Sequence, residues 1–153
     1  MSIVILCNAI KTGKSTSLFN WCKRQDKIID GYIMLEENNQ KVTYQAKNLT
    51  QFTYPKSSNI LCVGNYVFDE SLFKCAHNQI CETLKENVFD ILCLDEIGKL
   101  ELNDKGWHNT LIEILLHQKQ NLHKKYIIIV RDYLLSDVLL KYKINSYKLI
   151  NYL

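Results

Sequence analysis

A lysine and two hydroxyl side chains stand at the start of an expected helix, and their spacing suits the binding of a phosphate chain. Residues 8–16 follow an apolar run at 3–6, which we expect to be a strand, and precede a helix-compatible segment. Gly13, Lys14 and Ser15 match the second half of the pattern Gly-x4-Gly-Lys-Ser/Thr, the P-loop or Walker A motif, whose first glycine is Asn8 here. The amides of such a loop and the dipole of the following helix attract an anion. This segment is therefore a candidate phosphate-binding loop.

Within this candidate P-loop, individual side chains have expected roles. Lys14 would contact the β- and γ-phosphates of a nucleotide, and the Ser15 hydroxyl would bind Mg²⁺. The expected nucleotide-binding residues are Asn8, Ala9, Ile10, Lys11, Thr12, Gly13, Lys14, Ser15 and Thr16. Asn8 stands where the motif has its first glycine, and asparagine adopts left-handed backbone more readily than most residues. The alternative is a lysine–serine pair at an exposed helix start that binds no nucleotide.

Two adjacent carboxylates follow a second apolar run. Asp95 and Glu96 come directly after residues 91–94, which are apolar on both faces, as in a buried parallel strand. Open α/β sheets bind their ligands at the carboxyl ends of such strands. We interpret this segment as a Walker B element, in which Asp95 would hold Mg²⁺ through water and Glu96 would orient or deprotonate the attacking water. The alternative is a solvated strand end with a helix-capping role.

Apolar patterning predicts strands and helices that alternate along the chain. We expect strands at 2–7, 28–35, 60–63, 90–95, 126–130 and 147–150, and helices at 14–26, 70–86, 105–121 and 134–142. Residues 36–47 predict a β-hairpin with one face exposed to solvent. This alternation predicts a three-layer α/β fold with a mainly parallel central sheet and a β-hairpin insertion. We find no linker or repeat, so we expect one domain spanning residues 1–153.

Composition excludes several classes of protein. Hydrophobic residues make up 47% of the 153 and charged residues 23%, as in an ordinary globular domain. The net charge of +3 is too small a bias to favour nucleic-acid binding. No run reaches the roughly 18 apolar residues of a membrane helix, and the first apolar run is too short for a signal peptide. The six cysteines show no zinc-binding spacing. We therefore expect a reduced, cytoplasmic protein without a membrane partner; no protein partner can be inferred.

A longer segment around the two carboxylates resembles a known signature. Residues 95–102 read Asp-Glu-Ile-Gly-Lys-Leu-Glu-Leu, which resembles the Asp-Glu-Ile-Gly-Lys-Met-Glu-Leu signature of the small P-loop nucleoside-triphosphatases of the cancer-related NTPase type. Residues 62–66 are similar to the Val-Gly-x-Tyr segment of that family, and Gly31-Tyr32 is similar to its Gly-Phe strand. Residues 127–132 resemble a strand that ends near a family arginine. The resemblance covers nearly the whole chain.

This resemblance implies a RecA-like fold and an activity. Such proteins hydrolyse ATP, GTP and other nucleoside triphosphates with Mg²⁺, slowly and with broad base specificity. By position, Lys14, Ser15 and Thr16 match the family's phosphate and Mg²⁺ residues. Asp95 and Glu96 match its metal and catalytic carboxylates. The resemblance thus implies a Mg²⁺ site formed by Ser15 and Asp95.

The chain departs from the family within the loop. The family has glycine at the positions of Asn8 and Lys11, and losing two glycines could narrow or stiffen the phosphate cradle. The Lys11 side chain would either add a charge over the phosphates or point to solvent.

Two further basic residues are candidates for phosphate contacts. Arg131 follows an expected buried strand and would stabilise γ-phosphate charge as an arginine finger does, or would form a surface turn with Asp132. Lys99 would lie near the phosphates or pair with Glu101. The expected catalytic residues are Glu96, Lys14 and Arg131.

Two other functions are compatible with these motifs. A nucleoside or nucleotide kinase usually clamps two phosphorylated ligands with several arginines, and this chain has only Arg24 and Arg131. A non-catalytic nucleotide-binding switch is favoured by the altered loop at Asn8 and Lys11 and disfavoured by Glu96. The sequence alone leaves both possibilities open.

Overall fold

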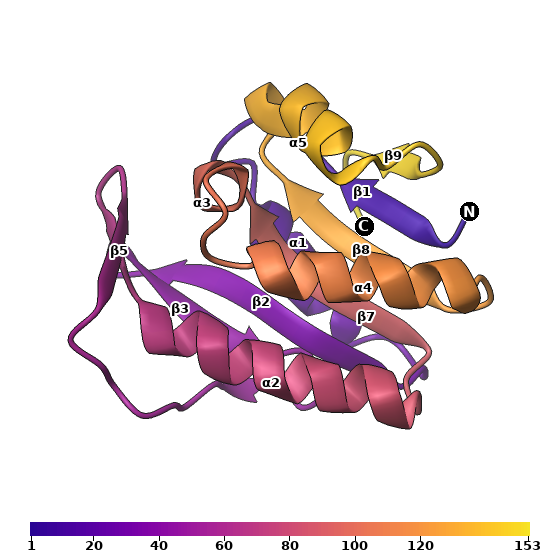
Figure 1. Ribbon diagram of the computed structural model, residues 1–153, viewed down its shortest axis with the longest axis horizontal. Coiled ribbons are helices and arrows are strands. Elements are labelled where there is room, and N and C mark those ends of the chain that lie inside the picture. Colours follow the sequence, from indigo (N-terminus) through magenta and orange to yellow (C-terminus); the bar gives the residue numbers. More distant parts are fainter.

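A seven-stranded sheet forms the centre of the structure, a computed structural model that describes residues 1–153 (Figure 1). Its strands are β1 (Ile3–Leu6), β2 (Ile29–Glu37), β3 (Gln40–Gln45), β4 (Thr50–Gln51), β7 (Ile91–Ile97), β8 (Lys125–Val130) and β9 (Lys148–Ile150). Their order is β4-β3-β2-β7-β8-β1-β9. Strands β2, β7, β8, β1 and β9 pair in parallel, and β3 and β4 are antiparallel additions at one edge. The predicted mainly parallel sheet is confirmed.

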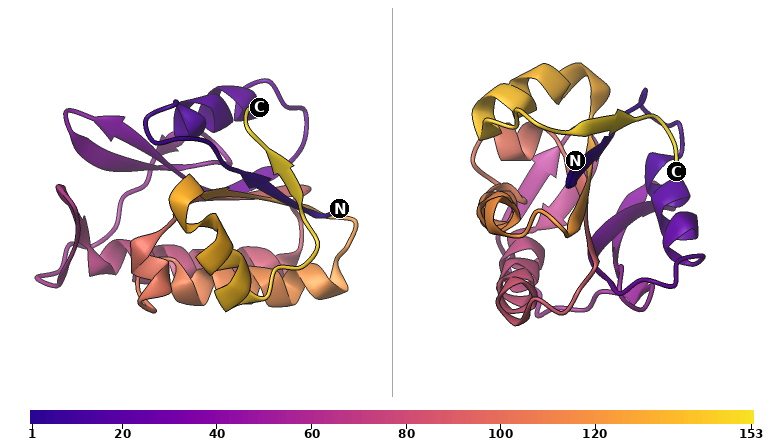
Figure 2. Two further views of the ribbon diagram at one scale, coloured as in Figure 1. Left: turned by 90° about the horizontal axis from the view of Figure 1, so that it is seen from above. Right: turned by 90° about the vertical axis from the view of Figure 1, so that its right-hand side faces the viewer.

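Helices cover both faces of this sheet (Figure 2). One face carries α1 (Lys14–Cys22), and the other carries α2 (Glu70–Glu86), α3 (Lys99–Leu102), α4 (His108–Gln120) and α5 (Leu135–Tyr142), which follows a 3-10 turn at Asp132–Leu134. Successive residues of the central strands point to opposite faces. In β7, for example, Leu92 and Leu94 pack under α2 and α4, whereas Ile91 and Cys93 pack under α1. The continuous apolar runs therefore arise because both faces are buried.

A separate two-stranded sheet projects beyond the end of the main sheet. It consists of β5 (Ile60–Val63) and β6 (Tyr66–Asp69), joined by the turn at residues 64–65. The sequence predicts β5 and its turn but not β6, in which no residue is buried. The predicted hairpin at 36–47 is present, but its first arm is the end of the long strand β2. Its turn lies at Asn38 and Asn39, which both have positive φ as a tight hairpin turn requires.

The helices match their predicted ranges to different degrees. Helix α2 has its predicted bounds, because Asp69 caps its first turn by accepting from the Ser71 amide and Asn87 ends it in left-handed backbone. Helix α1 ends at Cys22, four residues before its predicted end. No helix has the length and apolar character needed to cross a lipid bilayer.

Strands β2 and β7 approach closely at Gly31, which pairs with Cys93 and has a φ of 108°. A Cβ atom at this position would lie 1.9 Å from the backbone oxygen of Cys93. Gly31→Ala is therefore expected to lower the free energy of unfolding by about 3 kcal/mol or more, because steric overlap adds to backbone strain. Gly64→Ala is the control: its φ is also positive, but no atom lies within 4 Å of the added Cβ. Denaturant unfolding of both variants would show whether the contact, rather than φ alone, sets the cost.

Candidate functional site

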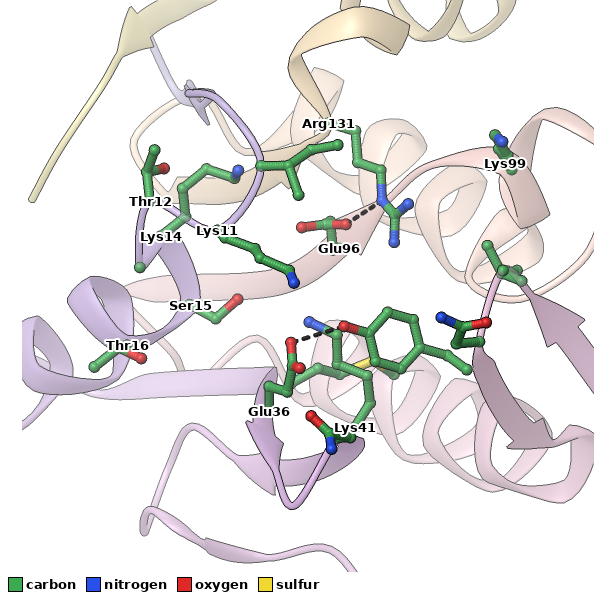
Figure 3. A pocket seen from close by; sticks show the side chains of 18 residues that line it. Lys11, Thr12, Lys14, Ser15, Thr16, Glu36, Lys41, Glu96, Lys99 and Arg131 are labelled. Atoms are coloured by element: carbon green, nitrogen blue, oxygen red, sulfur yellow. Dashed lines mark hydrogen bonds and ion pairs between the residues drawn. The ribbon is translucent and has the colours of Figure 1, made fainter.

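A cavity of about 550 Å³ lies at the carboxyl ends of the parallel strands (Figure 3). Residues 10–16 of the P-loop form one wall, and Glu96 of β7 and Arg131 after β8 face them. The end of β2, the start of β3 and the turn of the β5–β6 hairpin complete the lining. The fold thus brings the predicted Walker A and Walker B segments to one site.

The P-loop has left-handed backbone at two positions, Lys11 with φ 60° and Gly13 with φ 78°. Asn8 does not have positive φ, so the expectation that it replaces glycine through left-handed backbone is wrong. Its side chain instead makes two hydrogen bonds, one within the loop and one to the end of the chain. Oδ1 accepts from the Ala9 amide at 2.8 Å, and Nδ2 donates to the Asn151 carbonyl at 3.3 Å. Asn8 thereby connects the loop to the segment that follows β9.

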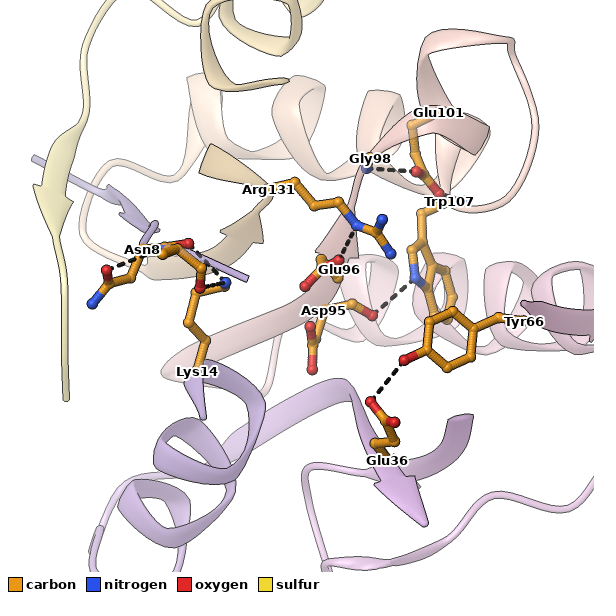
Figure 4. Close-up of polar contacts among 11 residues, drawn as sticks. Asn8, Lys14, Glu36, Tyr66, Asp95, Glu96, Gly98, Glu101, Trp107 and Arg131 are labelled. Atoms are coloured by element: carbon orange, nitrogen blue, oxygen red, sulfur yellow. Dashed lines mark hydrogen bonds and ion pairs between the residues drawn. The ribbon is translucent and has the colours of Figure 1, made fainter. Parts of the chain in front are cut away.

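Lys14 is the first residue of α1 and is almost entirely buried. Its Nζ donates to the carbonyl oxygens of Asn8 at 2.8 Å and Ala9 at 3.0 Å (Figure 4). The ammonium group is therefore bound to the loop's own backbone in this structure. To contact a phosphate, it would exchange these carbonyl acceptors for phosphate oxygens.

Asp95 is fully buried near the end of β7. Its Oδ2 accepts from the Met34 amide of β2 at 3.0 Å, and its Oδ1 has no hydrogen-bond partner. Burial and the adjacent Glu96 carboxylate raise the pKa of Asp95 to about 7, although the nearby Ser15 hydroxyl opposes this shift. A buried carboxylate oxygen without a partner is costly, so this atom is available to a cation or to a metal-bound water.

The donor atoms beside this orphaned oxygen suit Mg²⁺. The Ser15 hydroxyl and the Asp95 carboxylate are both oxygen donors, which this hard cation prefers. The chain has no group of three or more His, Cys, Asp and Glu side chains that could hold a metal ion. Mg²⁺ usually takes one or two protein oxygens and completes its shell with water and substrate phosphates. The residues present therefore fit this ion.

The buried Asp95 should make the stability of the metal-free protein depend on pH. Between pH 4 and 7 the folded state retains a proton on Asp95 that the unfolded chain has lost, so stability falls as pH rises through this range. In excess EDTA, the melting temperature of the wild type is expected to fall relative to that of Asp95→Asn from pH 5 to 8. A difference between the two proteins that stays constant with pH would contradict the burial of this charge.

Glu96 and Arg131 form an ion pair across the cavity, in which Nε of Arg131 donates to Oε1 of Glu96 (Figure 4). Both side chains are partly exposed, at 18% and 22%. Neither alternative for Arg131, an arginine finger or a surface turn with Asp132, anticipates this contact. The pair thus connects Glu96, the predicted catalytic carboxylate on β7, to the residue that follows the neighbouring strand β8.

The signature segment 95–102 is held in place by Glu101. This carboxylate is buried and accepts from the backbone amides of Gly98 and Trp107, both at 2.8 Å. The indole of Trp107 in turn donates to the Asp95 carbonyl at 3.0 Å. The predicted alternative of a Lys99–Glu101 ion pair is therefore wrong, and Lys99 lines the cavity instead. Through these contacts Glu101 and Trp107 fix the backbone of the predicted Walker B segment.

Tyr66, Glu36 and Lys41 line the cavity but were not among the predicted site residues. Tyr66 on β6 donates its hydroxyl proton to Glu36 on β2 at 2.7 Å, and the Lys41 ammonium lies 5.2 Å from the centre of the Tyr66 ring. The hydrogen bond to Glu36 raises the pKa of Tyr66, so its hydroxyl stays protonated. The only sequence signal was the resemblance of residues 62–66 to the family segment. Glu36 and Lys41 carry no pattern of their own.

The sequence and the fold of this chain both resemble those of known proteins. A family model described as NTPase matches residues 4–146. The crystal structure of THEP1 from the hyperthermophile Aquifex aeolicus is similar, with a TM-score of 0.69 and 14% sequence identity over 98% of this chain and 89% of that chain. At this identity the likeness shows the fold alone, and it confirms the predicted P-loop NTPase fold. No curated protein matches the chain significantly. The chain belongs to the NTPase family.

Proposed function

We propose that the protein hydrolyses nucleoside triphosphates to diphosphates and phosphate in a Mg²⁺-dependent reaction, slowly and with broad base specificity. The observation that carries this proposal is the position of Glu96 in the cavity wall opposite the P-loop, directly after the buried Asp95, whose orphaned oxygen belongs to a carboxylate beside the Ser15 hydroxyl. A binding site alone would need the loop and the metal-binding carboxylate. A second carboxylate, partly exposed and facing the same space, is the group that hydrolysis additionally requires.

Each residue has a defined part in this reaction. Lys14 contacts the β- and γ-phosphates, with the amides of residues 9–16 around them. Ser15 and Asp95 would hold Mg²⁺, which would neutralise phosphate charge when bound. Glu96 orients a water molecule and accepts its proton as the oxygen attacks the γ-phosphorus. The bond between the γ-phosphorus and the bridging oxygen breaks, and the diphosphate leaves.

Arg131 can contact Glu96 and the γ-phosphate at the same time. Its contact to Glu96 uses Nε, which leaves its terminal amino groups to contact the γ-phosphate. We propose that Arg131 holds Glu96 toward the cavity and stabilises the charge that develops on the transferred phosphoryl group. Arg131 therefore remains a proposed catalytic residue.

The test is phosphate release with MgATP and MgGTP, each with and without excess EDTA. The proposal predicts release from both nucleotides that stops when EDTA removes Mg²⁺. Diphosphate formed only after a phosphate acceptor is added would instead identify a kinase. Tight MgATP binding without any release would identify a nucleotide-binding switch.

A further inference from the structure

The cavity is lined mainly by polar side chains and carries an excess of positive charge. Of its 18 lining residues, four are hydrophobic. The charged lining residues are the cations Lys11, Lys14, Lys41, Lys99 and Arg131 and the carboxylates Glu36 and Glu96. Cations that outnumber carboxylates in one cleft attract a polyanion. The lining therefore favours a chain of phosphates.

Lys11 is a cation that the P-loop pattern does not require. Its φ of 60° is a conformation that costs free energy for any residue with a Cβ, yet a lysine occupies it. The side chain extends into the cavity between Ser15 and Glu96, not away from it (Figure 3). Lys14 and Arg131 are already bound to oxygen acceptors, whereas Lys11 makes no hydrogen bond or ion pair. Its charge is free for a phosphate.

The one aromatic side chain of the cavity already has polar partners. Tyr66 is the aromatic residue of the lining, and a nucleotide base would need its ring face or hydroxyl for recognition. The hydroxyl is bound to Glu36, and the Lys41 ammonium lies over the ring. The lining thus offers several cations to phosphates, whereas its one aromatic side chain already has a cation and a carboxylate as partners.

We propose that the site recognises the phosphate chain itself and that inorganic tripolyphosphate, with no base or sugar, is a substrate. This inference rests on the proposed hydrolase function. Water attacks a terminal phosphorus, its proton passes to Glu96, and the bond to the bridging oxygen breaks. The products are pyrophosphate and phosphate. Lys11 contributes charge to the bound chain for this substrate and for nucleotides alike.

The first test is phosphate release from magnesium tripolyphosphate and from MgATP by the same preparation. We expect the two kcat/KM values to agree within about tenfold, because most of the recognition is shared. Glu96→Gln protein purified in parallel measures any contaminating phosphatase. Hydrolysis of MgATP with tripolyphosphate at least about 100-fold slower would overturn this inference and leave the proposed function intact. Hydrolysis of neither substrate would overturn both.

The second test isolates the charge of Lys11. Lys11→Met and Lys11→Gly are each expected to lower kcat/KM for both substrates by about tenfold, as the loss of one charge-assisted contact does. Lys11→Gly also removes the strain of a positive φ, so an equal loss of kcat/KM in the two variants would assign the effect to the lost charge. Lys11→Arg should retain most activity. The control is Lys47→Met, which removes an exposed lysine outside the lining. Unchanged values in Lys11→Met and Lys11→Gly would contradict the role of this side chain.

Discussion

Glu96→Gln is expected to lower kcat for MgATP by about 10²–10⁴-fold, the range for loss of a general base. The amide has the size of the carboxylate but cannot accept the proton of the attacking water. Nucleotide affinity should change little, because in the proposed mechanism Lys14, Ser15 and Asp95 would supply the ground-state contacts to phosphate and Mg²⁺. Steady-state phosphate release and calorimetric titration with a non-hydrolysable analogue measure the two quantities separately.

The substitution also removes one charge of the Glu96–Arg131 ion pair. Both side chains are partly exposed, so the remaining arginine stays hydrated and the loss of stability should be small. Glu82→Gln, a change at an exposed position on α2, is the matched control and should leave kcat unaltered. An unchanged turnover in Glu96→Gln would remove Glu96 from the reaction and leave a binding site only.

Lys14→Met should weaken MgATP binding by about 10- to 100-fold, the value of one strong charge-assisted contact. The methionine retains the apolar stem of this nearly buried side chain but offers no donor to the β- and γ-phosphates. It also leaves the carbonyls of Asn8 and Ala9 without their ammonium partner, so the loop itself could loosen.

Two comparisons separate these effects of Lys14. Lys14→Arg restores the charge, so recovery of affinity would show that charge matters more than loop rigidity. Lys47→Met removes the same charge from an exposed position and should bind MgATP like the wild type. Calorimetry that gave one affinity for wild type and Lys14→Met would contradict the P-loop assignment.

Local signals in the sequence were sufficient for much of the fold. Helix α2 was predicted with its bounds because its apolar period and both of its ends are encoded in adjacent residues. Strand β4 was missed because two residues carry too little pattern, and β6 because none of its residues is buried and so no apolar alternation marks it. These strands form because β4 pairs with β3 and β6 pairs with β5.

In the site, too, some features could be predicted from contiguous residues and others could not. The Walker A and Walker B segments are each contiguous, and parallel strands necessarily bring their carboxyl ends to one edge, so their convergence was predictable. The Glu96–Arg131 contact could not be predicted in this way. It joins a side chain of β7 to one that follows β8, and no sequence pattern specifies the rotamers of these two side chains. The burial of Asp95 and the Tyr66–Glu36 contact likewise depend on how β2, β7 and the β5–β6 hairpin pack.

Hydrolysis of MgATP in ¹⁸O-labelled water tests the central claim most directly. If a water held by Glu96 attacks the γ-phosphorus, mass spectrometry should find one solvent oxygen in each released phosphate and none in the ADP. Label in the ADP would place the attack at the β-phosphorus, and bound MgATP that released no phosphate would show no hydrolysis at all. Either result would contradict the mechanism proposed for this cavity.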